Sequence, residues 1–398
     1  MSTVLAKQIN TIIDEGTQVH FERVSVMRLI WTSLLARKHP FLLGPPGTNK
    51  TRLIDWVCNS IDGAAFWEVL CNNQLGLEDF FGPIDMVAYD KQNVWHRATA
   101  GYMPEADVVM LDEVFKANGA VLNPLLDFLV RFQVKVNSKP MPVPTLMVCM
   151  ASNELPTGEE LGAFWDRRGP AIVLDYIQEK GNFRKLLELA GGDIAPPATP
   201  TKVDLADVQN AVMNEVPAVK VGAGIYDALD ALKDACEHPT DSLPAIRISD
   251  RRWYQAVSLV KASAYLAGRD HCDDDDLQVL RHFIWETPEM IGTADKRVLS
   301  LASPQTAKAL DIGEAVDEFT TKVAGVKGQS AAAKAELGAE INGKIKKMFA
   351  EIGDLKQQAH AAGRSTTKIE EIEDRVGNLR RTVLIECLNV PREAAERL

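Results

Sequence analysis

The stretch FLLGPPGTNKT, residues 41–51, constrains the possible folds of this chain more than any other feature. It reads as a short buried strand, a tight glycine- and proline-rich loop, and a Lys50-Thr51 pair that opens a helix. Backbone N–H groups of such a loop point into one concavity and the helix N-terminus adds positive potential, so the stretch predicts a phosphate-binding cradle. Its expected nucleotide-binding residues are Gly44, Pro45, Pro46, Gly47, Thr48, Asn49, Lys50 and Thr51.

Within this cradle, Lys50 is expected to reach the β- and γ-phosphates of ATP, and the Thr51 hydroxyl is expected to bind Mg²⁺. One position departs from the usual pattern GxxxxGK[ST], because Asn49 replaces the last glycine. Asn is the non-glycine residue that best tolerates a left-handed backbone, so the turn should survive. For an isolated motif, the alternative is a chance turn with a solvated lysine.

Sixty-two residues after Lys50, the apolar run VVML ends in Asp112 and Glu113. Such a run is typical of a buried parallel strand, and ligands of open α/β sheets bind at the carboxyl ends of the strands. We expect Asp112 to hold the Mg²⁺ shell and Glu113 to orient or deprotonate the attacking water. The alternative, a strand that simply ends in solvated acids, does not account for the spacing from the cradle.

Two further sites follow along the chain. A third apolar strand, TLMVCMASNE, ends near Asn153, which either lies between the γ-phosphate and the water or is an ordinary turn residue. The segment FWDRRGP then places Arg167 and Arg168 before the strand AIVLDYI. An arginine there would supply positive charge to the transition state of a neighbouring subunit, whereas the alternative is a surface ion pair with Asp166.

Together these residues resemble the AAA+ ATPases of the MoxR family, and within it most closely the RavA branch. The resemblance covers roughly residues 5–295 in the family's order and spacing, and it is carried by FLLGPPGTNKT, EDFFGPIDM, GYMPEADVVMLDEVFKA, LNPLLDFL, ASNELP, DRRGPAIVLDYIQEKGNF and ISDRRW. It implies a Walker A motif at Lys50 and Thr51, a Walker B motif at Asp112 and Glu113, sensor 1 at Asn153, an arginine finger at Arg167 and sensor 2 at Arg251. Arg168 and Arg252 are the neighbours with which the two arginines could be confused.

The expected fold is α/β, with a P-loop AAA+ parallel-sheet core followed by an all-helical lid and a C-terminal helical hairpin. The core is predicted over residues 1–190 with an inserted hairpin near 83–103, the Pro- and Gly-rich linker over 191–202, the lid over 203–297 and the C-terminal extension over 298–398. In the lid, Ser249 or Asp250 is expected to cap a helix that begins near Arg251.

The inserted hairpin is predicted from Val87–Tyr89 and Val94–His96, which flank the polar residues 90–93. In the resembling family an insertion at this place projects toward the pore of a ring. Tyr89, Trp95 and Tyr102 are therefore expected either to touch a remodelled polypeptide or to pack against the sheet.

The last hundred residues contain two apolar seams with helical spacing. An antiparallel helical hairpin is the simplest fold for them, as an intramolecular brace or as a docking arm. The seams consist of Leu337, Ile341, Ile345, Met348, Ile352 and Leu355, and, after Gly363-Arg364-Ser365, of Ile369, Ile372, Val376, Leu379 and Val383.

Composition narrows the protein class. Among 398 residues there is no apolar run of membrane-spanning length and no signal-peptide pattern at the N-terminus, so a cytoplasmic protein without a membrane partner is expected. The net charge of −11 makes nucleic acid a less favoured partner. The six cysteines lack CxxC spacing and are expected to be buried thiols. A metal site could be formed by His271, Cys272 and the acids 273–276. Capping of a helix start by these acids is the favoured interpretation.

The expected activity is Mg-ATP hydrolysis at subunit interfaces of a homo-oligomeric ring, a hexamer by the resemblance, with Glu113 activating water and Arg167 acting in trans. The resemblance implies chaperone-like remodelling or maturation of a client protein, with a von Willebrand factor A domain protein as a separate partner. Two alternatives stay open. One is a nucleic-acid motor or chelatase-like subunit, and the other is an ATP-gated assembly scaffold with little turnover, which the substitution at Asn49 would favour.

Overall fold

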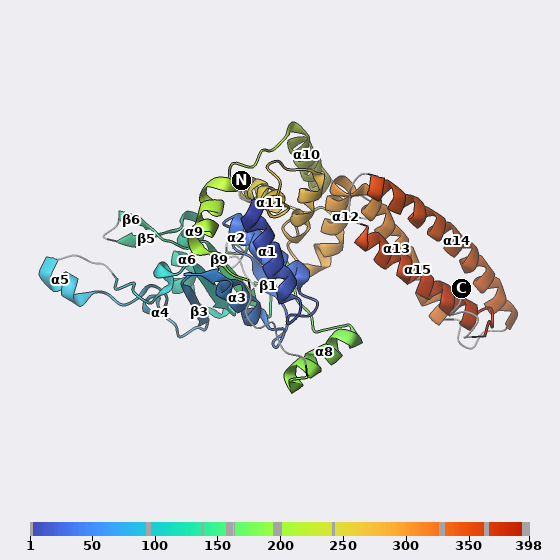
Figure 1. The fold of residues 1–398 in the computed structure, drawn as a ribbon, viewed down its shortest axis with the longest axis horizontal. Helices are drawn as coiled ribbons and strands as arrows, with labels where there is room; N and C mark the ends of the chain where they lie inside the picture. Colours follow the sequence, from blue (N-terminus) through green and yellow to red (C-terminus); the bar gives the residue numbers. More distant parts are fainter. Residues whose placement is uncertain are drawn as a thin grey trace. The chain divides into compact units, whose positions relative to one another are not determined.

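The computed structural model describes residues 3–92, 97–136, 139–156, 162, 164–193, 201–240, 243–325, 331–361 and 366–391. They form two compact units, residues 1–291 and 292–398. Figure 1 shows the elements of both units, coloured along the chain from blue to red.

A five-stranded parallel sheet forms the centre of the first unit, in the order β3-β4-β7-β1-β8. The central strands β4 and β7 are buried over almost their whole length. Because all strands are parallel, their carboxyl ends meet at one edge, where polar side chains from distant motifs can converge. The predicted parallel α/β core is confirmed. The strands are β1 (Phe41–Leu43), β3 (Phe66–Leu70), β4 (Val108–Asp112), β7 (Met147–Ser152) and β8 (Ala171–Val173).

Helices flank this sheet, and two of them precede its first strand, so the alternation of strands and helices starts only at β1. The second, α2, buries nine of its twelve residues and is a core helix rather than a surface one. No helix in the described part of the chain is long and apolar enough to cross a bilayer. The flanking helices are α1 (Thr3–Gly16), α2 (Val24–Leu35), α3 (Lys50–Asn59), α4 (Leu77–Phe81) and α6 (Gly119–Arg131). A further helix, α8 (Lys180–Gly191), follows β8 and has no buried residue.

The inserted segment is built differently from the predicted hairpin. Val87–Tyr89, expected as a strand, lies within helix α5 (Met86–Gln92), so that expectation is wrong, while Val94–His96 lies outside the described residues. The Asp85 carboxylate accepts a hydrogen bond from the Val87 N–H at 3.0 Å, as a helix cap does, and this contact stabilises the start of the helix. The base of the insertion is nevertheless closed by an antiparallel bridge between Ile84 and Arg97.

Tyr102 packs at this base. Its ring lies so close to Gly82 that a Cβ added to that glycine would be only 3.1 Å from it. Of the three aromatic residues singled out in the sequence, Tyr89 lies in α5 and Trp95 falls outside the described residues. A separate antiparallel pair, β5 (Gln133–Val136) with β6 (Lys139–Pro142), follows α6. Figure 1 shows α5 and the β5–β6 pair extending from the same side of the core.

A buried histidine ties the end of α6 to the central sheet. His39 Nε2 lies 2.8 Å from the Leu129 carbonyl, and Nδ1 accepts a hydrogen bond from the Val148 N–H at 3.1 Å. These partners require the neutral ring with its proton on Nε2. Burial lowers the pKa of His39 to about 3.

We expect the variant His39→Gln to flatten the pH dependence of stability. Above pH 6.5, the ordinary pKa of His39, both folded and unfolded chains carry the neutral ring. As the pH falls, His39 binds a proton in the unfolded chain but not in the folded one. The free energy of unfolding of the wild type should therefore fall by about 2 kcal/mol from this residue by pH 5. Thermal midpoints between pH 5 and 7.5 measure the slope, with the exposed His360→Gln as control. A variant slope equal to that of the wild type would contradict the assignment.

After the core, helices predominate among the described residues of 201–291. A two-residue strand, β9 (Val203–Asp204), pairs in parallel with β2 (Ile61–Asp62). Ser249 caps α11 as predicted, because its hydroxyl accepts a hydrogen bond from the Arg252 N–H at 3.3 Å. The helical elements are α9 (Leu205–Asn210), the π-helical η3 (Ala211–Glu215), α10 (Ala223–Glu237), α11 (Asp250–Leu266), and the 3₁₀ segments η4 (Asp274–His282) and η5 (Pro288–Met290).

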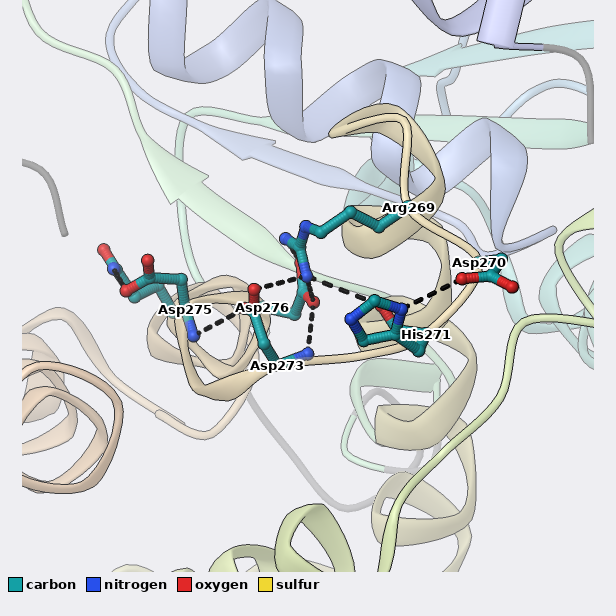
Figure 2. Close-up of polar contacts among 7 residues, drawn as sticks. Arg269, Asp270, His271, Asp273, Asp275 and Asp276 are labelled. Carbon is teal, nitrogen blue, oxygen red and sulfur yellow. Dashed lines mark hydrogen bonds and ion pairs between the residues drawn. The ribbon is translucent and has the colours of Figure 1, made fainter. Parts of the chain in front are cut away.

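The acidic run 273–276 caps the start of η4 (Figure 2). The Asp273 carboxylate accepts a hydrogen bond from the Asp275 N–H at 3.0 Å, and the Asp276 carboxylate accepts one from the Asp273 N–H at 2.9 Å. Arg269 also pairs with Asp276 through both terminal nitrogens, at 2.7 and 2.9 Å. The predicted capping role of these acids is confirmed.

All six cysteines are buried free thiols, as predicted. Desolvation raises the pKa of Cys71 to about 12 and that of Cys272 to about 11. Because the thiolate is the reactive form, these side chains act as apolar packing groups at neutral pH.

The second unit is helical, and its apolar seams form one core. The seam residues Ile341, Ile345, Ile352 and Leu355 of α14 pack with those of α15, as the predicted hairpin requires, while residues 363–365 lie outside the described chain. A third helix, α13, adds Ile312, Val316 and Phe319 to this core, beyond the two helices of the predicted hairpin. The elements are α12 (Ile291–Ala302), α13 (Pro304–Ala324), α14 (Ala331–Ala361) and α15 (Thr367–Glu386), and Figure 1 shows the last three side by side.

Candidate active site

The loop between β1 and α3 has the geometry of a phosphate cradle. Asn49 adopts the left-handed conformation (φ 61°, ψ 33°) that its position was expected to need, and Gly47 also has a positive φ of 83°. The Thr48 hydroxyl donates a hydrogen bond to the Pro45 carbonyl at 2.9 Å, which closes the loop on itself. Gly44 cannot carry a side chain, because a Cβ there would lie 2.4 Å from the Leu174 carbonyl oxygen.

Lys50 connects this loop to the end of β7. Its ammonium donates hydrogen bonds to the carbonyl of Gly44 at 2.6 Å and to the Oδ1 atom of Asn153 at 2.8 Å. Burial lowers the pKa of Lys50, and the nearby charges of Asp112 and Glu113 act in the opposite direction. Residues that lie a hundred positions apart in the sequence are thereby brought within hydrogen-bonding distance.

Two acids complete the polar end of the sheet. Asp112 is the last residue of β4, and its Oδ1 accepts a hydrogen bond from the Glu113 N–H at 3.0 Å. Glu113 is buried and has a left-handed backbone (φ 52°), and its Oε2 lies 3.3 Å from the Lys116 Nζ. The left-handed turn redirects the chain at the strand end, so that both carboxylates line the same cavity.

This cavity of about 290 Å³ gathers the predicted motifs. Carboxylate and hydroxyl oxygens are ligands that Mg²⁺ prefers, so Asp112 and Thr51 fit a metal that would be held beside the cradle. The lining comprises Pro46, Gly47, Thr48, Asn49, Lys50, Thr51, Arg52, Asp112, Glu113 and Asn153.

A second cavity, of about 300 Å³, adjoins the first and shares Gly47, Thr48 and Asn49 with it. Its walls are mostly apolar, which suits the flat ring of a nucleobase next to a phosphate site. None of the residues that only this cavity contains was predicted as a site residue, because they come from separate segments that only the fold brings together. The remaining lining residues are Val19, His20, Phe21, Arg23, Leu53, Tyr176, Ile177, Phe183 and Leu186.

His20 contributes an uncharged ring to this wall. Burial, followed by the charges of Arg52 and Arg23, lowers its pKa to about 4. Its ring packs edge-on against Trp56, with centroids 5.8 Å apart. At neutral pH the residue is therefore an aromatic wall element rather than a cation.

The structure separates the roles of the first arginine pair. Arg168 is completely buried: it donates hydrogen bonds to the Gly169 carbonyl at 3.1 Å and to the Trp285 carbonyl, and its guanidinium lies 4.1 Å from the centre of the Trp165 ring. Arg167 is only partly buried. Arg168 thus has a structural position, which leaves Arg167 as the arginine of this pair that can act at the surface.

The second pair shows the same division. Arg252 is completely buried and pairs with Glu286, with its guanidinium 4.8 Å from the centre of the Phe283 ring. Arg251 is exposed and forms an ion pair with Asp166 at 3.0 Å. Desolvation lowers the pKa of Arg167, and the charge of Arg251 lowers it further.

Asp166 joins the two arginine segments. One carboxylate oxygen contacts Arg251, and the other accepts a hydrogen bond from the Ser249 hydroxyl at 2.6 Å. Among the described residues that line the two cavities, neither Arg167 nor Arg251 is found. The structure therefore brings together the cradle, Asp112, Glu113 and Asn153, whereas the two arginines lie outside the lining of both cavities.

Comparisons with known proteins agree with this geometry. Residues 7–210 match the family model of the "MoxR domain in the MoxR-vWA-beta-propeller ternary systems", and residues 224–298 match that of an AAA lid domain. Two uncharacterized proteins of Methanocaldococcus jannaschii are similar along most of their length. MJ0812 is 30% identical over 94% of this chain and 98% of its own, and MJ0079 is 31% identical over 81% and 82%.

Among solved structures, a protein of Cytophaga hutchinsonii described as a candidate ATPase has the same fold. The similarity has a TM-score of 0.58 at 18% identity and covers 74% of this chain and 94% of that one. At this low sequence identity, the structural similarity supports the fold alone. The match of half of the chain to the MoxR family model, together with the match to the AAA lid model, identifies the group, and this chain belongs to the MoxR-type AAA+ ATPases.

Proposed function

We propose that the protein hydrolyses Mg-ATP and couples hydrolysis to the remodelling or maturation of a client protein. The observation that carries the proposal is the convergence of Lys50, Asp112, Glu113 and Asn153 on one cavity that adjoins an apolar one. The first cavity offers groups for phosphates and water, and the second offers a surface for a base. This combination suits a nucleoside triphosphate better than an isolated phosphate.

In this mechanism Glu113 orients the attacking water and accepts its proton, because its carboxylate is the buried base of the cavity. Asn153, at the end of the adjacent strand β7, positions the water relative to the γ-phosphate. Lys50 binds the β- and γ-phosphates. Thr51 and Asp112 would hold Mg²⁺, which would neutralise negative charge on the phosphate oxygens.

Arg167 is proposed to act on a neighbouring copy of the chain, in a homo-oligomeric ring of six subunits. Support comes from its partial exposure and from its position outside the lining of its own cavities. In the same proposal Arg251 senses nucleotide from the start of α11, and its ion pair with Asp166 would be exchanged for a phosphate contact.

The partner that we propose is a separate polypeptide with a von Willebrand factor A domain. The description of the matching family model names such domains, and this chain has no DxSxS run of its own. The narrower relation to the RavA branch rests on the sequence motifs alone. Stimulation of turnover by DNA rather than by a protein partner would favour the nucleic-acid motor instead.

Complementation between two inactive variants tests the shared site. We expect steady-state ATP hydrolysis to rise with protein concentration, to vanish in Arg167→Ala and in Lys50→Ala, and to return partly in an equimolar mixture of the two. The mixture can form interfaces that combine an intact cradle from one copy with an intact arginine from the next. Turnover that is independent of concentration and of Arg167 would contradict the oligomeric mechanism and leave a monomeric nucleotide switch.

A further inference from the structure

Helix α8 has an unusual position for an amphipathic helix. None of its side chains is fully buried, and Phe183 and Leu187 are 52% and 56% exposed. Phe183 and Leu186 nevertheless form part of the wall of the apolar cavity. Packing into a core therefore does not hold α8 in place, and other contacts must position this part of the wall.

Those contacts come from Glu22. Its two carboxylate oxygens accept hydrogen bonds from the N–H groups of Gln178 at 3.0 Å and Glu179 at 2.9 Å, at the start of α8. The Asn182 side-chain amide adds a third, at 3.2 Å. Within the described chain, Glu22 accepts every hydrogen bond that joins residues 178–191 to another segment.

The backbone at Glu22 has an uncommon conformation, and the next residue fixes it by hydrogen bonds. Glu22 has a left-handed conformation (φ 61°), which is uncommon for a residue with a side chain of this length. The next residue, Arg23, donates hydrogen bonds to the Glu22 carbonyl at 3.2 Å and to the Asp175 carbonyl. The hydrogen bonds from Gln178 and Glu179 also lower the pKa of Glu22, so the carboxylate is charged at neutral pH.

Both segments joined in this way line the cavity. Val19, His20 and Phe21 directly precede Glu22, while Tyr176 and Ile177 directly precede Gln178. The Tyr176 hydroxyl also donates a hydrogen bond to the Pro46 carbonyl of the cradle at 3.2 Å. The Glu22 contacts thus connect two lining segments of the cavity, and Tyr176 links the second of them to the phosphate loop.

We propose that Glu22 is a positioning residue that holds α8 against the base side of the nucleotide site and thereby slows nucleotide release. The proposal rests on the proposed function, because it takes a nucleotide as the occupant of the cavity. Glu22 does not line the cavity itself and acts through the residues on either side of it.

Release of a fluorescent ADP analogue, followed by stopped flow, tests the role of Glu22. Glu22→Ala removes the acceptor of three hydrogen bonds, two of them from the backbone, so release should be about tenfold faster than in the wild type. Glu22→Gln keeps one acceptor oxygen and should fall between the two. Glu179→Gln is the matched control, since it removes the same charge at the same helix start but leaves the Glu22 contacts intact. Thermal midpoints of all four proteins should agree closely.

Hydrogen exchange in the nucleotide-free protein provides a second, independent measurement. In Glu22→Ala, amides in residues 175–187 should exchange faster than in the wild type and in Glu179→Gln. Unchanged exchange, or faster exchange with unchanged ADP release, would overturn the positioning role. Failure of the wild type to bind the analogue would instead overturn the proposed nucleotide function, and with it the effect on release. The exchange data would still show whether Glu22 holds α8.

Discussion

Glu113→Gln is expected to lower the rate of ATP hydrolysis by about 10²- to 10⁴-fold, the range of a lost general base, while ATP still binds. Gln keeps the shape of Glu113 and one acceptor oxygen but cannot take a proton from water. The left-handed backbone at this position and the cradle should be retained, because neither depends on the charge. Single-turnover hydrolysis and binding of a fluorescent ATP analogue separate the two effects.

The matched control for this experiment is Glu154→Gln. Glu154 lies beyond the end of the neighbouring strand β7 and is exposed, and it does not line the polar cavity. Its loss should leave turnover close to that of the wild type. If Glu113→Gln hydrolysed ATP as fast as Glu154→Gln, Glu113 would not be the base that activates water.

Arg168→Ala is expected to destabilise the protein strongly, whereas Arg167→Ala should leave stability nearly unchanged and abolish turnover. Removal of the Arg168 guanidinium leaves the carbonyls of Gly169 and Trp285 without their donor and opens a void beside Trp165. The combined loss should be about 2 to 4 kcal/mol, and the thermal midpoint should fall by roughly 5 °C or more.

Thermal denaturation and ATP hydrolysis of the two variants measure this contrast. Arg168→Lys serves as a further test, because an ammonium cannot reproduce the planar stacking and the two directed hydrogen bonds of the guanidinium. It should therefore recover only part of the lost stability. Equal stability of Arg168→Ala and the wild type would contradict the structural role of Arg168, and a large loss of stability in Arg167→Ala would contradict the surface role of Arg167.

The nucleotide motifs were predictable because each is a local pattern with a direct physical meaning. A tight loop before Lys50 and acids at the end of an apolar strand are read from neighbouring residues, and the sheet then brings them together. The tolerance of Asn49 for a left-handed backbone also follows from its own side chain, and the structure has that conformation.

Other features depend on contacts between distant residues and leave no local signal. Arg168 and Arg252 each stand beside a second arginine, and only the packing of Phe283 and Trp285 shows which member is buried. The apolar cavity combines loops after α1 and β8. In the insertion, Asp85 caps a helix in a segment whose composition is strand-like.

The burial of Arg168 and Arg252 has a consequence for how the first unit unfolds. Both guanidinium groups, which come from the segment before β8 and from α11, hold the short stretch 283–286 that follows η4. The nucleotide core and the helical region after it are therefore joined by these two buried guanidinium groups. Unfolding of either region would expose the buried contacts that the other region makes with residues 283–286. Residues 1–291 should accordingly lose their structure in a single cooperative step rather than as a core and a lid in succession.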